Sequence, residues 1–183
     1  MMRLAPVALF YAHDPEVAVR MAGESSRTTH GTAAAIDACR YFAGLIVGAL
    51  AGVSKAELLS PSYSPVVDLW KKEPLHPAVA PVAEGSFRSR QPLAIRGTGY
   101  VVRSLEAALW ALASTHDFAG GALAAVNLGE DADTPGAVYG QLAGAVYGVN
   151  AIPAKWRDTI SMSFEIEKLA ERLLERATAD RVK

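Results

Sequence analysis

The sequence predicts an all-α fold, a compact domain of orthogonally packed helices with one long proline-rich loop. Residues that commonly cap helices, such as Asp, Ser and Thr, stand immediately before most of the apolar segments with helical periodicity. No segment alternates apolar and polar residues convincingly as a half-buried strand does, and Tyr100-Val-Val102 is too short to change the class. A chain of 183 residues suits a single domain, residues 1–183, with a sizeable core.

Three helices are expected in the first sixty residues, each after a capping residue. They cover about 15–28 after Asp14, about 33–51 after Thr32, and a short stretch after Ser54, where Glu57 completes a capping box. Residues 61–92 carry six prolines and little periodicity, so we expect a long loop with a helical turn or two. The run Gly97-Thr-Gly99 predicts a tight turn.

Five further helices are expected after this turn. They cover 105–114 after Ser104, 118–126 after Asp117, about 135–148, a short stretch around Trp156, and a final helix from Ser163. The final helix carries apolar residues on one face, namely Ile166, Leu169, Ala170, Leu173, Leu174 and Ala177. This spacing is typical of an amphipathic helix.

Composition limits the classes of partner and compartment. With 51% hydrophobic and 20% charged residues, the chain is expected to be globular. A net charge of −1 gives no electrostatic basis for binding nucleic acid or an anionic membrane. The single Cys39, which we interpret as a small buried residue, excludes an internal disulfide and fits a cytoplasmic location. The longest uncharged run, residues 41–54, is shorter than the roughly 20 residues of a membrane span.

Two series of glycines recur at intervals of four residues. Gly136, Gly140, Gly144 and Gly148 form one series, and Gly44, Gly48 and Gly52 form the other. Each glycine inside a helix costs about 1 kcal/mol relative to alanine, so a series of them needs compensation. We interpret both series as helix faces packed closely against another backbone, and the first as a rigid platform for the loop before it.

That loop, Asn127-Leu-Gly-Glu-Asp-Ala-Asp-Thr134, contains two carboxylates and a hydroxyl directly before a helix. Hard divalent cations prefer such oxygen ligands, so Asp131, Asp133 and Thr134 could bind one. The alternative is that Thr134 only caps the helix, with Pro135 in its first turn. The residues alone slightly favour capping and leave both functions open. An EF-hand does not fit, because Leu142 stands where a bidentate glutamate is needed.

Several segments carry a family resemblance over nearly the full length of the chain. They are residues 2–11 (MRLAPVALFY), 25–30 (SSRTTH), 95–102 (IRGTGYVV), 104–110 (SLEAALW), 125–134 (AVNLGEDADT), 140–148 (GQLAGAVYG) and 152–156 (IPAKW). Together, and in this order, they resemble the C-terminal part of the ADP-ribosylglycohydrolases. This resemblance favours metal binding over simple capping at the acidic loop.

The resemblance implies an all-α hydrolase with two neighbouring divalent metal ions, usually Mg²⁺ or Mn²⁺. Its substrates would be ADP-ribosylated proteins or small molecules, cleaved at the N- or O-glycosidic bond of the ADP-ribose. The matching residues are Asp131, Asp133 and Thr134 for the metal, and Thr29, His30, Gly99 and Tyr100 for the substrate. Metal ions can clamp ribose hydroxyls and orient water, which suits this chemistry.

The sequence departs from the family in two motifs. It contains no Thr-Asp-Asp-Thr segment with its nearby acidic residue, and no Gly-Asn-Gly loop precedes Met2-Arg3. The catalytic residue is therefore unknown, and we expect this chain alone to be weakly active or inactive. The alternative is a non-catalytic truncated homologue that serves as a structural or nucleotide-binding helical module. Loss of the family's N-terminal helices would expose apolar surface, which predicts a homo-oligomer joined partly through residues 1–10 and the glycine-lined helices.

Overall fold

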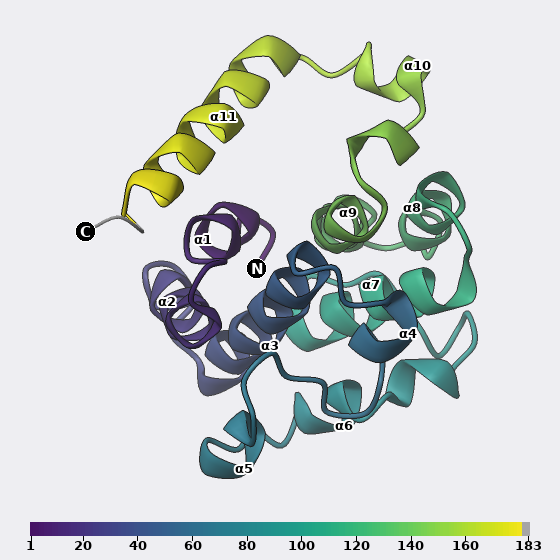
Figure 1. Cartoon of the computed structure of the whole chain (residues 1–183). Coiled ribbons are helices and arrows are strands. Elements are labelled where there is room, and N and C mark those ends of the chain that lie inside the picture. The colour runs from purple at the N-terminus through teal and green to yellow at the C-terminus, as the bar shows by residue number, and fades with distance from the viewer. Residues whose placement is uncertain (181–183) are drawn as a thin grey trace.

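The chain is all-α, as predicted, in a computed structural model that describes residues 1–180 (Figure 1). Within these residues there is no β-sheet, only an isolated bridge between Pro92 and Ile95. The first helices are α1 (Ala5–Phe10), α2 (Pro15–Arg27), α3 (Ala33–Leu50), α4 (Lys55–Leu58), α5 (Leu69–Lys72) and α6 (Ala80–Ala83). Then follow η1 (Ser86–Arg88), α7 (Val101–Ser114), α8 (Phe118–Val126), α9 (Asp133–Tyr147), η2 (Val149–Ala151), α10 (Ala154–Arg157) and α11 (Ser163–Asp180).

Four of the predicted helix starts are confirmed by their caps. In each, the side chain of the capping residue accepts a hydrogen bond from the backbone N–H three residues later, which satisfies a donor that the helix itself leaves free. These caps are Asp14 for α2, Thr32 for α3, Ser54 for α4 and Asp117 for α8. Short polar side chains before apolar segments were therefore a reliable signal in this sequence.

The predicted Ser104 cap is wrong, and the capping role that the residues alone left open for Thr134 is not observed. Helix α7 begins four residues earlier than expected, with Tyr100 at its N-cap, and Ser104 lies buried in its first turn. The Ser104 hydroxyl donates to the carbonyls of Thr98 (2.5 Å) and Tyr100 (3.2 Å) instead of accepting from the helix. Helix α9 begins at Asp133, so Thr134 is inside it and is not its cap. Helix α1 was missed because it is only six residues long and contains Pro6.

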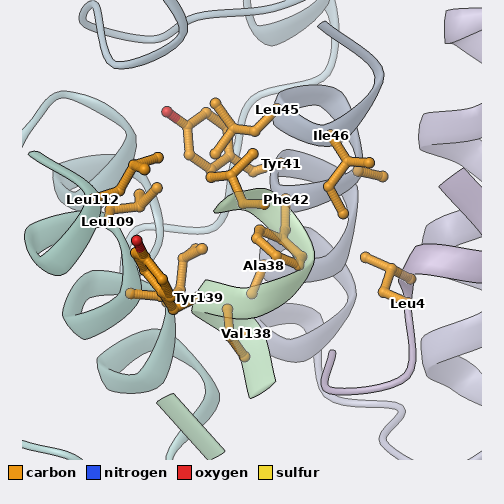
Figure 2. Packing of buried hydrophobic residues seen from close by; sticks show 14 of the residues in the cluster. Leu4, Ala38, Tyr41, Phe42, Leu45, Ile46, Leu109, Leu112, Val138 and Tyr139 are labelled. Atoms are coloured by element: carbon orange, nitrogen blue, oxygen red, sulfur yellow. The ribbon is translucent and has the colours of Figure 1, made fainter. Parts of the chain in front are cut away.

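Helix α3 forms the centre of the core. It packs against α2 on one side and against α7 and α9 on the other. Figure 2 shows Phe42 of α3 in one cluster with Leu109 of α7 and Tyr139 of α9. Among the described residues, α3 is also the one helix long and apolar enough to cross a membrane, but 67% of its residues are buried within the domain. Burial of this kind is what a core helix shows.

The glycine series behave differently on the two helices. A Cβ on Gly44 would lie 3.1 Å from the Pro65 ring, and one on Gly48 would meet the Tyr63 hydroxyl. Close packing is thus confirmed there, although side chains of the proline-rich segment, and not another helix backbone, provide it. For Gly140 and Gly144 the prediction is wrong, because no heavy atom of the described chain lies within 4 Å of an added Cβ.

The proline-rich segment folds back onto α3 and contains α5, α6 and η1. Arg40 of α3 pairs with Asp37 at 2.9 Å and with Glu73 of this segment. The other oxygen of Asp37 accepts a hydrogen bond from the His76 backbone at 2.7 Å. The Trp70 ring lies 5.5 Å from the Arg40 guanidinium and completes the contact. The expected long loop is therefore an ordered segment that packs along one side of α3.

Helix α11 stands apart from the rest of the domain in Figure 1. It packs on α1, and its buried residue in the described part is Ala177 near its C-terminal end. The apolar face predicted from the sequence exists, but most of it is exposed, with 62% of Leu169 and 67% of Leu174 accessible to solvent. An apolar face that lies open over several turns is unusual for a soluble domain.

Candidate functional site

A pocket of about 580 Å³ lies where the N-terminal segment, the end of α2, the start of α3 and the start of α7 meet. Its lining includes Thr29, His30, Gly99, Tyr100 and Thr134. The structure thus brings together the four residues predicted to bind substrate and one of the three predicted to bind metal. A pocket of this size is in the range of ligand-binding sites.

The Thr29-His30 pair is held by the last turn of α2. Both backbone N–H groups donate to the carbonyl of Ser26, at 3.1 Å and 2.7 Å, and the Ser26 hydroxyl donates to the His30 carbonyl at 2.9 Å. The His30 Nδ1 lies 3.0 Å from the Thr29 hydroxyl oxygen. Because that contact engages Nδ1, the other ring nitrogen, Nε2, can donate or accept a further hydrogen bond. The pair is therefore a preorganised polar wall of the pocket.

The turn at residues 97–100 fits tightly against the acidic loop. The Asp131 backbone N–H donates to the Gly97 carbonyl at 3.1 Å. A Cβ on Gly97 would lie 2.5 Å from the Asp131 carbonyl oxygen and 2.7 Å from that of Gly129, so only glycine fits. Tyr100 caps α7, and its half-exposed side chain lies against the pocket. The expected tight turn thus connects the substrate-binding residues with the metal-binding residues.

The acidic loop presents its carboxylates from a strained backbone. Gly129 and Glu130 both have positive φ angles, +79° and +58°, and the Glu130 carboxylate pairs with Arg96 at 3.2 Å. Asp131 Oδ1 accepts the Thr134 backbone N–H at 3.1 Å. Hydrogen bonds from the Thr134 side chain and backbone lower the pKa of Asp131 below its usual value, so this carboxylate is ionised at neutral pH.

The positions of the three metal-binding candidates differ. Thr134 lines the pocket, and Asp131 Oδ2 lies 3.5 Å from the position of an added Cβ on Gly99 at the pocket edge. Asp133 is exposed at the start of α9 and does not line the pocket. Within residues 1–180 no cluster of three or more His, Cys, Asp or Glu residues could hold a metal ion. The donors fit a hard divalent cation in kind but complete only part of its coordination shell.

Gln141 of α9 is a structural residue of the pocket that the sequence analysis missed. Its Oε1 accepts the backbone N–H groups of Leu4 (3.1 Å) and Ala5 (2.7 Å), and its Nε2 donates to the Met2 carbonyl (3.0 Å). One amide thus holds the segment that forms one pocket wall. The sequence shows only that a long polar residue stands among the small residues of this helix, which does not identify its distant partners.

Cys39 lies at the bottom of the same pocket. It is 1% exposed, as expected for a small core residue, yet it belongs to the pocket lining together with Ala35 of α3. The pocket therefore reaches down to the central helix. Its polar rim and apolar base are typical of sites for organic ligands.

Taken together, the structure is a helical domain with a pocket of ligand-binding size and an acidic loop at the pocket edge. The family model described as ADP-ribosylglycohydrolase matches residues 1–182. The chain therefore belongs to the ADP-ribosylglycohydrolase family.

Individual relatives agree with this assignment. The chain is 37% identical over 175 residues to an ADP-ribosylarginine hydrolase Tri1 of Pseudomonas putida, covering 96% of this chain and 45% of that protein. It is 32% identical over 171 residues to the Tri1 protein of Serratia proteamaculans, covering 93% of this chain and 44% of the relative. An ADP-ribosyl-[dinitrogen reductase] glycohydrolase of Rhodospirillum rubrum matches at 38% identity over 77 residues, 42% of this chain and 26% of that protein.

A solved structure agrees as well. The chain superimposes on a chain of an ADP-ribosylglycohydrolase-related protein complex with a TM-score of 0.85 and 43% identity, covering 96% of this chain and 58% of the other. The all-α class is thereby confirmed. The chain spans about half the length of the curated relatives that it matches.

Proposed function

We propose that this chain carries the ADP-ribose pocket and the metal loop of an ADP-ribosylglycohydrolase. The reaction is the metal-dependent hydrolysis of the N- or O-glycosidic bond of ADP-ribosylated substrates, with arginine-linked ADP-ribose as the first candidate. Water forms the new bond to the anomeric carbon, the glycosidic bond breaks, and the leaving group takes up a proton. The partner is thus an ADP-ribosylated protein or small molecule.

A single observation carries this proposal. Residues from two distant parts of the sequence, the Thr29-His30 pair and the Gly99-Tyr100 turn, line one pocket whose edge is the acidic loop with Asp131. This arrangement supports binding of ADP-ribose with its reactive ribose toward the loop. The Tyr100 ring offers an aromatic face, and the hydroxyls and His30 offer hydrogen bonds.

We further propose that Asp131, Asp133 and Thr134 contribute ligands to Mg²⁺ or Mn²⁺. When bound, the ion would polarise the ribose hydroxyls and stabilise the charge that develops at the anomeric carbon. Three ligands from one loop leave the other coordination positions to water, to the substrate and to residues from the rest of the family fold. Mn²⁺ binding to this chain alone should therefore be weak, and Asp133→Ala should abolish it in a calorimetric titration.

ADP-ribose binding tests the proposed site directly. Titration of the chain with ADP-ribose in the presence of Mg²⁺ should give a saturable signal that Tyr100→Ala weakens several-fold. Val67→Ala is the matched control, because Val67 is an exposed apolar residue outside the pocket. Equal affinity of wild type and Tyr100→Ala, or no binding at all, would contradict the proposal.

A non-catalytic module is the second candidate function. The observation that favours it is the incomplete donor set around the acidic loop in residues 1–180. A product assay can exclude this second candidate. The chain alone should show little hydrolysis of ADP-ribosyl-arginine, whereas metal-dependent turnover that Asp131→Ala removes would exclude the non-catalytic module.

We also propose that the chain self-associates through α11, together with the neighbouring α1. The exposed apolar face of α11 would be buried if a second copy of α11 packed against it. The charges along the helix favour an antiparallel orientation of the two copies. The first half of the helix carries Glu165, Glu167, Lys168 and Glu171, a net charge of −2, and the second half carries Arg172, Glu175, Arg176 and Asp180, a net charge of zero. Antiparallel copies therefore keep the two acidic halves apart and place Glu167 near Arg176 of the other copy. This interface is partly the one expected from residues 1–10.

A further inference from the structure

Glu106 of α7 is the most deeply buried charged residue outside the pocket. It is 2% exposed, and its two carboxylate oxygens each have a cationic partner. Oε1 lies 3.3 Å from Arg90 Nε, and Oε2 lies 2.9 Å from Arg103 Nη1. The Ser86 hydroxyl also donates to Oε1. Removing one partner of a buried ion pair leaves a charge in the interior without compensation, which strongly destabilises the fold. The arginine partners of Glu106 are therefore expected to stay in place.

The two arginines stand at either end of one segment, residues 91–100, which we call the strap. The strap has no regular secondary structure, but it is attached along its length. Ile95 is buried, and the Thr98 carbonyl accepts the Ser104 hydroxyl at 2.5 Å. Arg90 precedes the strap, and Glu106 lies on α7, which follows it, so the Arg90–Glu106 pair closes the segment into a loop of fixed span. Arg103 is three residues before Glu106 on the same helix and pairs with the other carboxylate oxygen.

The strap in turn holds the acidic loop. The Gly97 carbonyl accepts the Asp131 N–H at 3.1 Å, and Arg96 Nη1 lies 3.2 Å from Glu130 Oε1. The end of the strap is Tyr100, which lines the pocket. A continuous chain of contacts therefore runs from Glu106 through the strap to the metal-binding candidates and to the ligand pocket.

We propose that Glu106 is a positioning residue, which fixes the strap through Arg90 and thereby presets the acidic loop for its metal ion. This inference rests on the proposed function for the identity of the ion. Residues that do not touch a metal ion but hold its ligands in position commonly matter for binding, and their removal lowers the affinity for the metal about 10–100-fold. Here the effect passes through the backbone of the strap and not through a side chain in the site.

Arg90→Gln is the variant of choice for the test. It removes the anchor at the far end of the strap but leaves Glu106 with Arg103 and Ser86, so the core stays paired. Amide hydrogen exchange should speed up in residues 91–100 and 127–134 and stay unchanged in α3. Mn²⁺ affinity should fall about tenfold, and Arg90→Lys should restore part of both effects.

Lys71→Gln is the matched control, because Lys71 forms an exposed ion pair with Asp68, and both residues lie outside the strap and the acidic loop. It should change neither exchange in the acidic loop nor Mn²⁺ affinity. A lower melting temperature of Arg90→Gln without faster exchange in residues 127–134 would overturn the inference and leave Glu106 a purely structural role. If the wild type binds no Mn²⁺, the metal part of the proposed function fails, while the exchange measurement still decides whether the strap holds the loop.

Discussion

Because Gly97 has no side chain, the turn beside the substrate pocket can pack directly against the acidic loop. The two nearest atoms that an added Cβ would meet, the carbonyl oxygens of Asp131 and Gly129, belong to the backbone, which cannot rotate away as a side chain can. The sequence signalled a turn here but not its neighbour, because the acidic loop lies more than thirty positions further along the chain. The role of this glycine is visible only in three dimensions.

Gly97→Ala should lower stability by about 1–3 kcal/mol through overpacking and should displace the acidic loop. Chemical denaturation measures the first effect and Mn²⁺ titration the second. The matched control is Gly99→Ala, where the nearest atom, Asp131 Oδ2, lies at an ordinary 3.5 Å. Equal stability of both variants would show that the acidic loop can move away without cost.

Gln141 illustrates a residue whose importance the sequence could not reveal. Its partners Leu4 and Ala5 are more than 130 positions away, and no local pattern marks such a contact. By contrast, the Thr29-His30 pair and the Gly99-Tyr100 turn could be singled out from the sequence, because each stands in a short motif of the family resemblance, and both line the same pocket. Long-range hydrogen bonds are set by the packing of helices, which a single sequence does not display.

Gln141→Leu should destabilise the protein by about 1–3 kcal/mol, because the backbone donors of Leu4 and Ala5 lose their acceptor. It should also weaken ADP-ribose binding, since residues 1–4 form one pocket wall. Gln141→Glu keeps the acceptor and should cost less. Differential scanning calorimetry on the wild type and the two variants checks this order. If Gln141→Leu were as stable as the wild type, the hydrogen bonds of Gln141 would not be what holds the N-terminal segment.

At the scale of elements, the helix starts at Asp14, Thr32, Ser54 and Asp117 could be predicted because capping is local chemistry between residues three apart. The glycine series was harder to interpret. Both glycine series recur every four residues, but the sequence alone does not show which of the two helix faces is packed against other residues. Gly48 has Tyr63 and Leu58 against it, whereas Gly140 has open space.

The two glycines therefore predict opposite effects of the same substitution. Gly140→Ala should stabilise the protein by up to about 1 kcal/mol, because alanine is the better helix former and has room here. Gly48→Ala should destabilise it, because the Tyr63 hydroxyl occupies the space of the new methyl group. Urea denaturation of both variants measures the signs. A destabilising Gly140→Ala would mean that another polypeptide covers this face.

Helix α11 is the element whose environment the sequence failed to predict. Leu169→Glu places a charge in the centre of its open face and should dissociate the proposed dimer, which light scattering detects. Leu93→Glu is the control, because Leu93 is 87% exposed and lies outside α11. A wild type that is monomeric at high concentration would instead assign this face to another polypeptide segment.

Reversing one charge tests the orientation of the helices. In the antiparallel arrangement Glu167→Arg should weaken association, and the second change Arg176→Glu should restore it. In a parallel arrangement the second change would bring no recovery. Analytical ultracentrifugation of the single and double variants distinguishes these outcomes.

For the whole molecule, the all-α class could be predicted from the sequence, because helix caps and alternating strand patterns are local features that can be checked in every segment of the chain. The family followed from short motifs, and the match over residues 1–182 confirms it. The completeness of the site could not be predicted in the same way. A metal shell is assembled from distant residues, and the chain spans about half of its curated relatives.

The position of Cys39 gives the protein a built-in chemical reporter. It is the single thiol of the chain, and it lies beneath a pocket that opens to solvent through its polar rim. A small alkylating reagent such as iodoacetamide should reach it slowly in the free protein and more slowly when ADP-ribose fills the pocket. The rate of labelling, followed by intact-protein mass spectrometry, would thus measure occupancy without any engineered probe, and an unchanged rate at saturating ADP-ribose would place the ligand elsewhere.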